Sequence, residues 1–167
     1  RSCRRAPATN VLQVGETMKE DDIFAFVLMP FHGEFDDIYH LGIKETARSL
    51  GILAERVDEQ IFTEGMLDRI YRQIEVSDIV IADMSEKNPN VFYEVGYAHG
   101  REKLCILLTK DATDIPFDLK HYRHVVYGGS ISKLRESLTE ELAWAKSQIE
   151  TARNSRVKVS LSSAFGN

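Results

Sequence analysis

Short apolar runs, rich in β-branched and aromatic residues, recur along the middle of this chain and are separated by polar segments. A run of this kind forms a strand that is buried on both faces of a sheet. We expect five such strands, over residues 23–29, 52–57, 79–82, 104–108 and 124–127.

Between these runs the apolar residues recur every three or four positions, which is the period of an amphipathic helix lying on a sheet. We expect helices over residues 37–50, 64–76, 89–101 and 132–151. Asn88 and Pro89 suit the N-cap and the first position of the third helix. The residues expected to face the sheet are Ile38, Leu41, Thr46 and Leu50 in the first helix and Met66, Leu67, Ile70, Tyr71 and Ile74 in the second.

This alternation of strand and helix predicts an α/β fold of three layers, with helices on both faces of a parallel sheet. We expect a flavodoxin-like sheet of five strands in the order 2-1-3-4-5. Such sheets bind ligands outside the carboxyl ends of the strands, where the strand order reverses. Here the first and third strands meet at that point, and they end at Pro30 and Asp83.

Composition and charge limit the classes of protein to which this chain can belong. The chain has 167 residues, of which 43% are hydrophobic and 28% charged, as in an ordinary globular domain. Its net charge of -5 argues against a nucleic-acid surface, which needs clustered lysine and arginine. We divide the chain into a linker or arm (1–22), the α/β domain (23–151) and a C-terminal tail or short added strand (152–167).

The cysteines and the lengths of the apolar runs bear on the cellular compartment in which this protein is expected. Cys3 and Cys105 form no disulfide framework and have no metal-ligand spacing, so we expect a reduced, cytoplasmic protein without a metal. No apolar run approaches the roughly 20 residues that span a bilayer, and no signal peptide is evident, so we expect no membrane partner. The chain begins at Arg1, which suggests a fragment of a longer protein that is fused to further domains.

Two carboxylates are the strongest chemical candidates. Asp83 ends the third strand, and Glu94 lies on the helix that follows, so they could converge at one edge of the sheet. Asn90 precedes Glu94 by four residues, and Tyr97 follows Glu94 by three, so both are expected on the helix face of Glu94. The alternatives without a catalytic role are that Glu94 is a solvated carboxylate on the helix surface and that Asp83 is a cap or turn residue at the end of a strand.

A carboxylate in this position suits substitution at the anomeric carbon of a sugar, where it forms a covalent intermediate or stabilises an oxocarbenium ion. A second acid or hydrogen-bond donor would help the base to leave. The candidates are Asp83, Glu64 and His32. The sequence contains no Gly-x-Gly-x-x-Gly fingerprint, P-loop or serine nucleophile elbow, which removes support for a Rossmann dehydrogenase, an NTPase or an α/β-hydrolase.

Four segments together resemble the nucleoside 2-deoxyribosyltransferase-like superfamily, including its TIR-like branch. They are residues 79–83, residues 88–99 (Asn-Pro-Asn-Val-Phe-Tyr-Glu-Val-Gly-Tyr-Ala-His), residues 26–31 and residues 114–119. The resemblance covers about residues 23–142. It implies a nucleoside, a nucleotide or NAD as the substrate and no cofactor.

By this resemblance Glu94 is the nucleophile that takes the sugar, and Pro30 and Phe31 contact the nucleoside. An acidic residue six positions before the nucleophile holds the sugar hydroxyls in the deoxyribosyltransferases, and Asn88 stands in its place here. A neighbouring subunit completes the site in those enzymes, which implies a homo-oligomer. Relatives in the TIR-like branch cleave NAD or related nucleotides, and some act as defence effectors.

Two further readings of the same fold stay open. One is a catalytically silent module that senses nucleotides or binds proteins. The other is a phosphoacceptor receiver domain with Asp83 as the acceptor and Lys110 after the fourth strand, although it lacks the acidic pair after the first strand.

Overall fold

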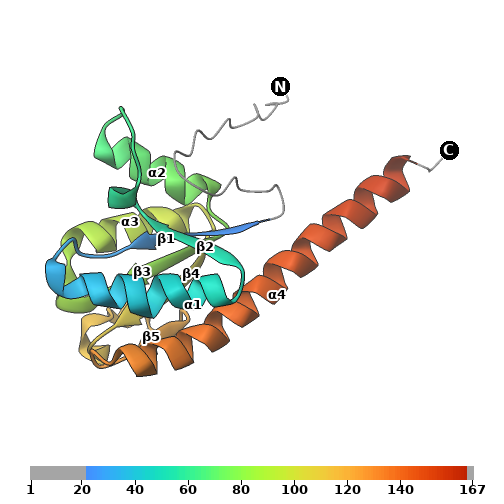
Figure 1. Ribbon diagram of the computed structural model, residues 1–167. Coiled ribbons are helices and arrows are strands. Elements are labelled where there is room, and N and C mark those ends of the chain that lie inside the picture. The colour runs from blue at the N-terminus through green and yellow to red at the C-terminus, as the bar shows by residue number, and fades with distance from the viewer. Residues whose placement is uncertain (1–21, 165–167) are drawn as a thin grey trace.

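A five-stranded parallel sheet forms the centre of the protein, whose structure is a computed structural model that describes residues 22–164 (Figure 1). The strand order is β2-β1-β3-β4-β5, which confirms the predicted fold class and topology. The strands are β1 (Ile23–Leu28), β2 (Ile52–Arg56), β3 (Ile79–Asp83), β4 (Leu104–Thr109) and β5 (His124–Val126).

Helices cover both faces of this sheet (Figure 1). One face carries α1 (Glu45–Ser49), the π-helix before it (Ile38–Lys44) and α4 (Ile131–Ala164), whereas the other carries α2 (Met66–Val76) and α3 (Pro89–Gly100). Short 3₁₀ turns complete the connections at Gly33–Phe35, Val57–Glu59, Ser85–Lys87, Ala112–Asp114 and Phe117–Leu119.

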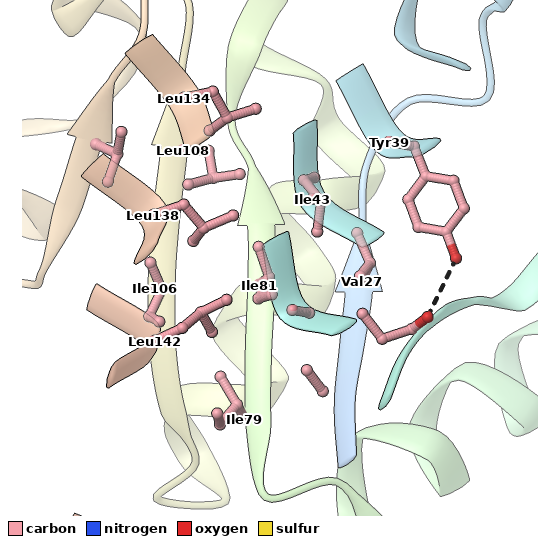
Figure 2. Close-up of a cluster of buried hydrophobic side chains, with 14 of the residues drawn as sticks. Val27, Tyr39, Ile43, Ile79, Ile81, Ile106, Leu108, Leu134, Leu138 and Leu142 are labelled. Atoms are coloured by element: carbon pink, nitrogen blue, oxygen red, sulfur yellow. Dashed lines mark hydrogen bonds between the residues drawn. The ribbon is translucent and has the colours of Figure 1, made fainter. Parts of the chain in front are cut away.

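The side chains of β3 alternate between two cores because successive residues of a strand point to opposite faces. Ile79 and Ile81 join the core beneath α1 and α4, whereas Val80 and Ala82 join the core beneath α2 and α3. Figure 2 shows the first of these cores, with leucines from α4 lying against the strands. These leucines, Leu134, Leu138 and Leu142, are fully buried.

The first helix differs from its prediction, because it begins as a π-helix over Ile38–Lys44. The wider turns of a π-helix change which side chains reach the sheet. Leu41 was expected to face the core but is 43% exposed, while Tyr39 and Ile43 are fully buried. Gly42 also faces inward, where a Cβ atom would lie only 2.7 Å from Leu134 Cδ2, so the glycine allows α4 to approach closely.

The second helix starts two residues later than expected and leaves its first turn uncovered. Met66 is 54% exposed and Leu67 47% exposed, although the sequence pattern placed both against the sheet. Ile70 and Ile74 are buried as predicted. The first turn of α2 therefore has apolar side chains that do not belong to the core.

The last helix is longer than its prediction, because α4 continues to Ala164. The expectation of a tail or short strand after residue 151 is wrong for residues 152–164. No glycine or proline occurs between Ile131 and Ala164 to end the helix. Figure 1 shows its C-terminal half leaving the sheet behind. An ion pair of 3.0 Å between Arg153 and Asp78 ties the helix to the amino edge of the sheet.

The remaining parts of the domain division, most of the predicted linker over residues 1–22 and the end of the chain after Ala164, lie outside the described residues. Within residues 22–164, no helix combines the length and the apolar character that crossing a bilayer requires.

The burial difference along these helices predicts a stability contrast. Leu138→Ala should lower the free energy of unfolding by about 2 to 5 kcal/mol, because it leaves a cavity in the core beneath α4. Leu41→Ala, at a site predicted from sequence to be buried, should change it by less than about 1 kcal/mol. Urea unfolding followed by circular dichroism measures both. Equal losses in the two variants would contradict the π-helical placement of Leu41.

Candidate active site

A cleft of about 410 Å³ opens at the carboxyl edge of the sheet, beside the ends of the neighbouring strands β1 and β3. Three segments line it: the residues after β1, the first turns of α2 and the first turns of α3. This is the switch point at which the sequence predicted a ligand site. Its volume lies within the range of small-molecule pockets.

The segment after β1 contributes Met29, Pro30 and Phe31 to the cleft, so the two residues predicted to contact a nucleoside line it. Phe31 is 53% exposed, so its ring is available to a ligand. The guanidinium carbon of Arg56 lies 5.7 Å from the centroid of this ring, within the range of a cation–π contact. Arg56 itself is held by Asp58, at 2.6 Å, and by Asp36, at 3.1 Å.

The first turns of α2 form an apolar wall of Met66, Leu67 and Ile70. Sequence reasoning assigned all three to the core, because a cleft wall and a core face have the same helical spacing. The position of these residues along the helix could have indicated the cleft. A helix that follows a parallel strand starts beyond the carboxyl ends of the strands. Apolar residues in that first turn have no sheet beneath them.

The start of α3 supplies the polar wall. The Asn88 side chain accepts hydrogen bonds from the backbone N–H groups of Asn90, at 3.0 Å, and Val91, at 3.4 Å, which confirms it as the N-cap. Both asparagines line the cleft, and their binding of a substrate stays a prediction. Since the Asn88 oxygen serves the helix, its side-chain NH₂ group is the part left for a ligand.

Glu94 lies one turn further along α3 and brings its carboxyl group to the same cleft. Its side chain is half-buried, and no residue in the described part of the chain gives it a hydrogen bond or an ion pair. Burial raises the pKa of this carboxyl from an ordinary 4.5 to about 7, because the charged form loses water without gaining a partner. A strongly shifted carboxyl in a cleft marks a functional-site candidate.

Asp83 does not share this cleft, and the expected convergence of two carboxylates is wrong. Asp83 follows Ile79 and Ile81 in strand parity, so its side chain lies on the α4 face, whereas Glu94 belongs to the α3 face. It is fully buried, and it accepts hydrogen bonds from the Tyr127 hydroxyl at 2.7 Å and the Ser85 backbone N–H at 3.0 Å. Because a phosphoacceptor must reach a phosphodonor, this burial also contradicts the receiver-domain reading.

Tyr97 lies outside the cleft as well. Its ring stacks on Tyr71 of α2, with centroids 4.2 Å apart, and its hydroxyl donates to Glu75 at 2.7 Å. Tyr93, which lies just before Glu94 in the chain, lines the cleft instead and is 64% exposed. Sequence spacing alone favoured Tyr97, because it does not show that the neighbouring helix α2 covers that side of α3.

The other two predicted site residues also lie elsewhere. Glu64 precedes α2 and forms ion pairs with Arg69, at 3.5 Å, and Arg72, at 3.3 Å, rather than facing the cleft. His32 follows Phe31 but is exposed and does not line the cleft.

His32 instead belongs to a cluster with Glu34 and Glu86, whose potential ligand atoms lie within 4.8 Å of one another. The Lys110 ammonium group already lies 3.4 Å from the Glu34 carboxylate and 3.7 Å from that of Glu86. We assign no metal to this cluster, since all three side chains are exposed and a cation of the chain itself balances the two carboxylates.

Comparison with solved structures identifies relatives of this fold. A 2-deoxyribosyltransferase from the psychrotolerant bacterium Bacillus psychrosaccharolyticus aligns with a TM-score of 0.50 and 14% identity, over 62% of this chain and 85% of that one. A 2-desoxiribosyltransferase from Leishmania mexicana aligns with a TM-score of 0.46 and 18% identity, over 53% of this chain and 65% of that one.

A putative pilus assembly-related protein from Burkholderia pseudomallei K96243 aligns over 80% of this chain and 96% of its own, with a TM-score of 0.48 and 13% identity. No protein-family model and no curated protein sequence matches this chain. The 2-deoxyribosyltransferase-like fold expected from the sequence is therefore confirmed as a fold. Membership of the TIR-like branch, a homo-oligomer and a defence role stay predictions.

The raised pKa of Glu94 predicts a pH-dependent stability. Below pH 4.5 the carboxyl is neutral in both states, whereas its ionisation above pH 7 destabilises the folded state, so stability falls as the pH rises between these values. Glu94→Gln removes this penalty. The variant should exceed the wild type by about 1 to 3 kcal/mol in free energy of unfolding at pH 8 and equal it at pH 4. Urea titrations across this range test it; parallel stability curves would contradict the pKa shift.

Proposed function

We propose that this protein cleaves the N-glycosidic bond of a nucleoside, with Glu94 as the nucleophile and with water or a second base as the acceptor of the sugar. One observation carries the proposal: a half-buried carboxyl group without a partner faces a cleft of about 410 Å³ at the switch point of the sheet. The likeness in fold to a 2-deoxyribosyltransferase supports it.

The cleft offers each part of a nucleoside a suitable surface. Phe31 and Tyr93 supply exposed aromatic rings on which a base can stack, and the apolar side chains of α2 add apolar surface to the cleft. The side chains of Asn88 and Asn90 supply polar groups for the sugar hydroxyls or the edge of the base. Glu94 then provides the negative charge that an oxocarbenium-like transition state requires.

The reaction follows from these positions in two steps. A Glu94 carboxylate oxygen forms a bond to the anomeric carbon while the bond from that carbon to the base nitrogen breaks, and the base leaves with the electron pair and takes up a proton. Water or another base then attacks the anomeric carbon, loses a proton and releases the carboxylate.

The charge of the cleft favours an uncharged substrate. None of the described residues that line it is a lysine or an arginine, and Glu94 is itself an acid. The two arginines of α2, Arg69 and Arg72, are paired with Glu64. Arg56, beside the Phe31 ring, does not line the cleft and is paired with Asp58 and Asp36. A phosphate group would therefore meet no unpaired cation in the cleft wall, which supports a nucleoside over a nucleotide or NAD as the substrate.

Base release tests the reaction. The wild type, incubated with a panel of ribonucleosides, deoxyribonucleosides, nucleotides and NAD, with and without a second free base, should release a free base that chromatography detects. Glu94→Gln should lower this rate by about a hundredfold or more, because the amide cannot act as the nucleophile. The wild-type rate should rise with pH through about 7, as Glu94 ionises.

The matched control is Glu140→Gln, which makes the same chemical change at an exposed site on α4 and should leave the rate unchanged. Unchanged base release in Glu94→Gln would rule out the nucleophile. Calorimetric binding of a nucleoside without base release from any member of the panel would favour the catalytically silent module instead.

The charge argument predicts a ranking of ligands. A nucleoside should bind to Glu94→Gln at least about tenfold more tightly than its 5′-monophosphate, because the cleft has no cation for the phosphate. Adding Leu67→Lys to Glu94→Gln should reduce the ratio of the two affinities, because it places an ammonium group on the α2 wall that can pair with the phosphate. Isothermal titration calorimetry measures both affinities, and tighter binding of the monophosphate than of the nucleoside to Glu94→Gln would contradict the argument.

A further inference from the structure

Asp83 is a buried acid that the proposed reaction does not use. It ends β3 with no exposed surface, and its side chain lies on the opposite face of the sheet from the cleft. Burial raises the pKa of its carboxyl, while hydrogen bonds and the nearby Lys110 act in the other direction. Such a group is costly in a protein interior unless its partners compensate, so its contacts indicate what it does.

These contacts join two parts of the carboxyl edge. One carboxyl oxygen accepts from the hydroxyl of Tyr127, directly after β5, and the other accepts from the backbone N–H of Ser85. Ser85 is the second residue of the connection between β3 and α3, the first of its 3₁₀ turn, and is itself fully buried. Asp83 therefore fixes Ser85, near the start of the connection that leads to the Glu94 helix.

The same turn is fastened to the neighbouring strand β4. The Ser85 hydroxyl accepts from the backbone N–H of Lys110 at 2.8 Å, and the Met84 backbone N–H donates to the Leu108 carbonyl at 2.8 Å. Further along the turn, the Glu86 backbone N–H donates to the Asp114 carboxylate at 3.0 Å. Each residue from 84 to 86 thus has a specific anchor.

Anchors are needed here because the turn holds an unfavourable backbone. Glu86 has a φ of 62° and Lys87 a φ of 52°, and neither is a glycine. L residues avoid this left-handed region, and two in succession persist only where the surroundings hold them. The next residue is Asn88, the cap of α3, so the direction in which that helix starts depends on this turn.

We propose that Asp83 is a positioning residue for the cleft: through Ser85 and Tyr127 it holds the turn over residues 84–88, with Glu86 and Lys87 in the left-handed region, and so sets the start of α3 and keeps Glu94 against the cleft wall. An effect of Asp83 on catalysis rests on the proposed function, whereas its effect on the position and burial of Glu94 does not. If the turn loosens, water reaches Glu94 and its burial decreases.

The ionisation of Glu94 reports this geometry directly. In the wild type, the ¹³C resonance of the Glu94 side-chain carboxyl should titrate near 7. Asp83→Ala leaves Ser85 N–H and the Tyr127 hydroxyl without their acceptor, and it should lower the pKa of Glu94 by about one unit or more, toward the ordinary 4.5. Tyr127→Phe, which removes one anchor of Asp83, should shift the pKa of Glu94 in the same direction by less.

A control separates positioning from a general loss of stability. Leu142 is buried in the same core, and Figure 2 shows it near Ile79 and Ile106, whereas the turn follows the other end of β3, after Asp83. Leu142→Ala should lower the melting temperature and leave the pKa of Glu94 unchanged. An unchanged pKa in Asp83→Ala, or an equal shift in Leu142→Ala, would overturn the proposal.

Two features keep the test decisive. If Asp83→Ala does not fold, Asp83→Asn retains the shape of the side chain and one acceptor oxygen, and Tyr127→Phe retains the acid; an unshifted pKa of Glu94 in both would overturn the proposal. Since the measurement uses no substrate, a wild type that releases no base would refute the proposed function and leave this result intact. In an active protein, the Asp83 variants should lose turnover in proportion to the shift.

Discussion

The burial of β3 on both faces is the constraint on which the rest of the structure depends. Between β1 and β4, its side chains are shared between two apolar cores, and no polar group along it reaches solvent before the strand ends. Polar chemistry is therefore confined to the turn after the strand and to the first turns of α3. The single acid within β3, Asp83, has to be satisfied internally, and its partners come from the same edge of the sheet.

The cleft follows from that arrangement. The reversal of strand order beside β1 leaves a gap that neither α2 nor α3 fills, and the first turn of each helix lines it. Its walls are mainly apolar, and Glu94 is its one ionisable carboxyl among the described lining residues. A low-polarity wall around an unpaired carboxyl explains the raised pKa, and it would also strengthen the interaction of the carboxylate with a positive charge that develops on a substrate.

Sequence reasoning predicted the features that depend on local pattern. The strands, their order and the Asn88 cap follow from apolar runs, crossover rules and capping chemistry, and the placement of Glu94, Asn90, Pro30 and Phe31 follows from topology. Sequence reasoning failed for features that depend on which helix packs against a residue. The face on which Asp83 lies, the choice of Tyr93 over Tyr97, and the exposure of Leu41, Met66 and Leu67 are set by neighbouring helices that no local window contains.

The ammonium group of Lys110 has a wider consequence for the edge of the sheet. It lies between the carboxylates of Glu34 and Glu86 and 4.0 Å from the centre of the Phe35 ring, so it joins the turns that follow β1 and β3. A counter-ion that is part of the chain stays at a high effective concentration however dilute the solution becomes. A free divalent cation would therefore have to displace this tethered ammonium group before it could bridge the two carboxylates.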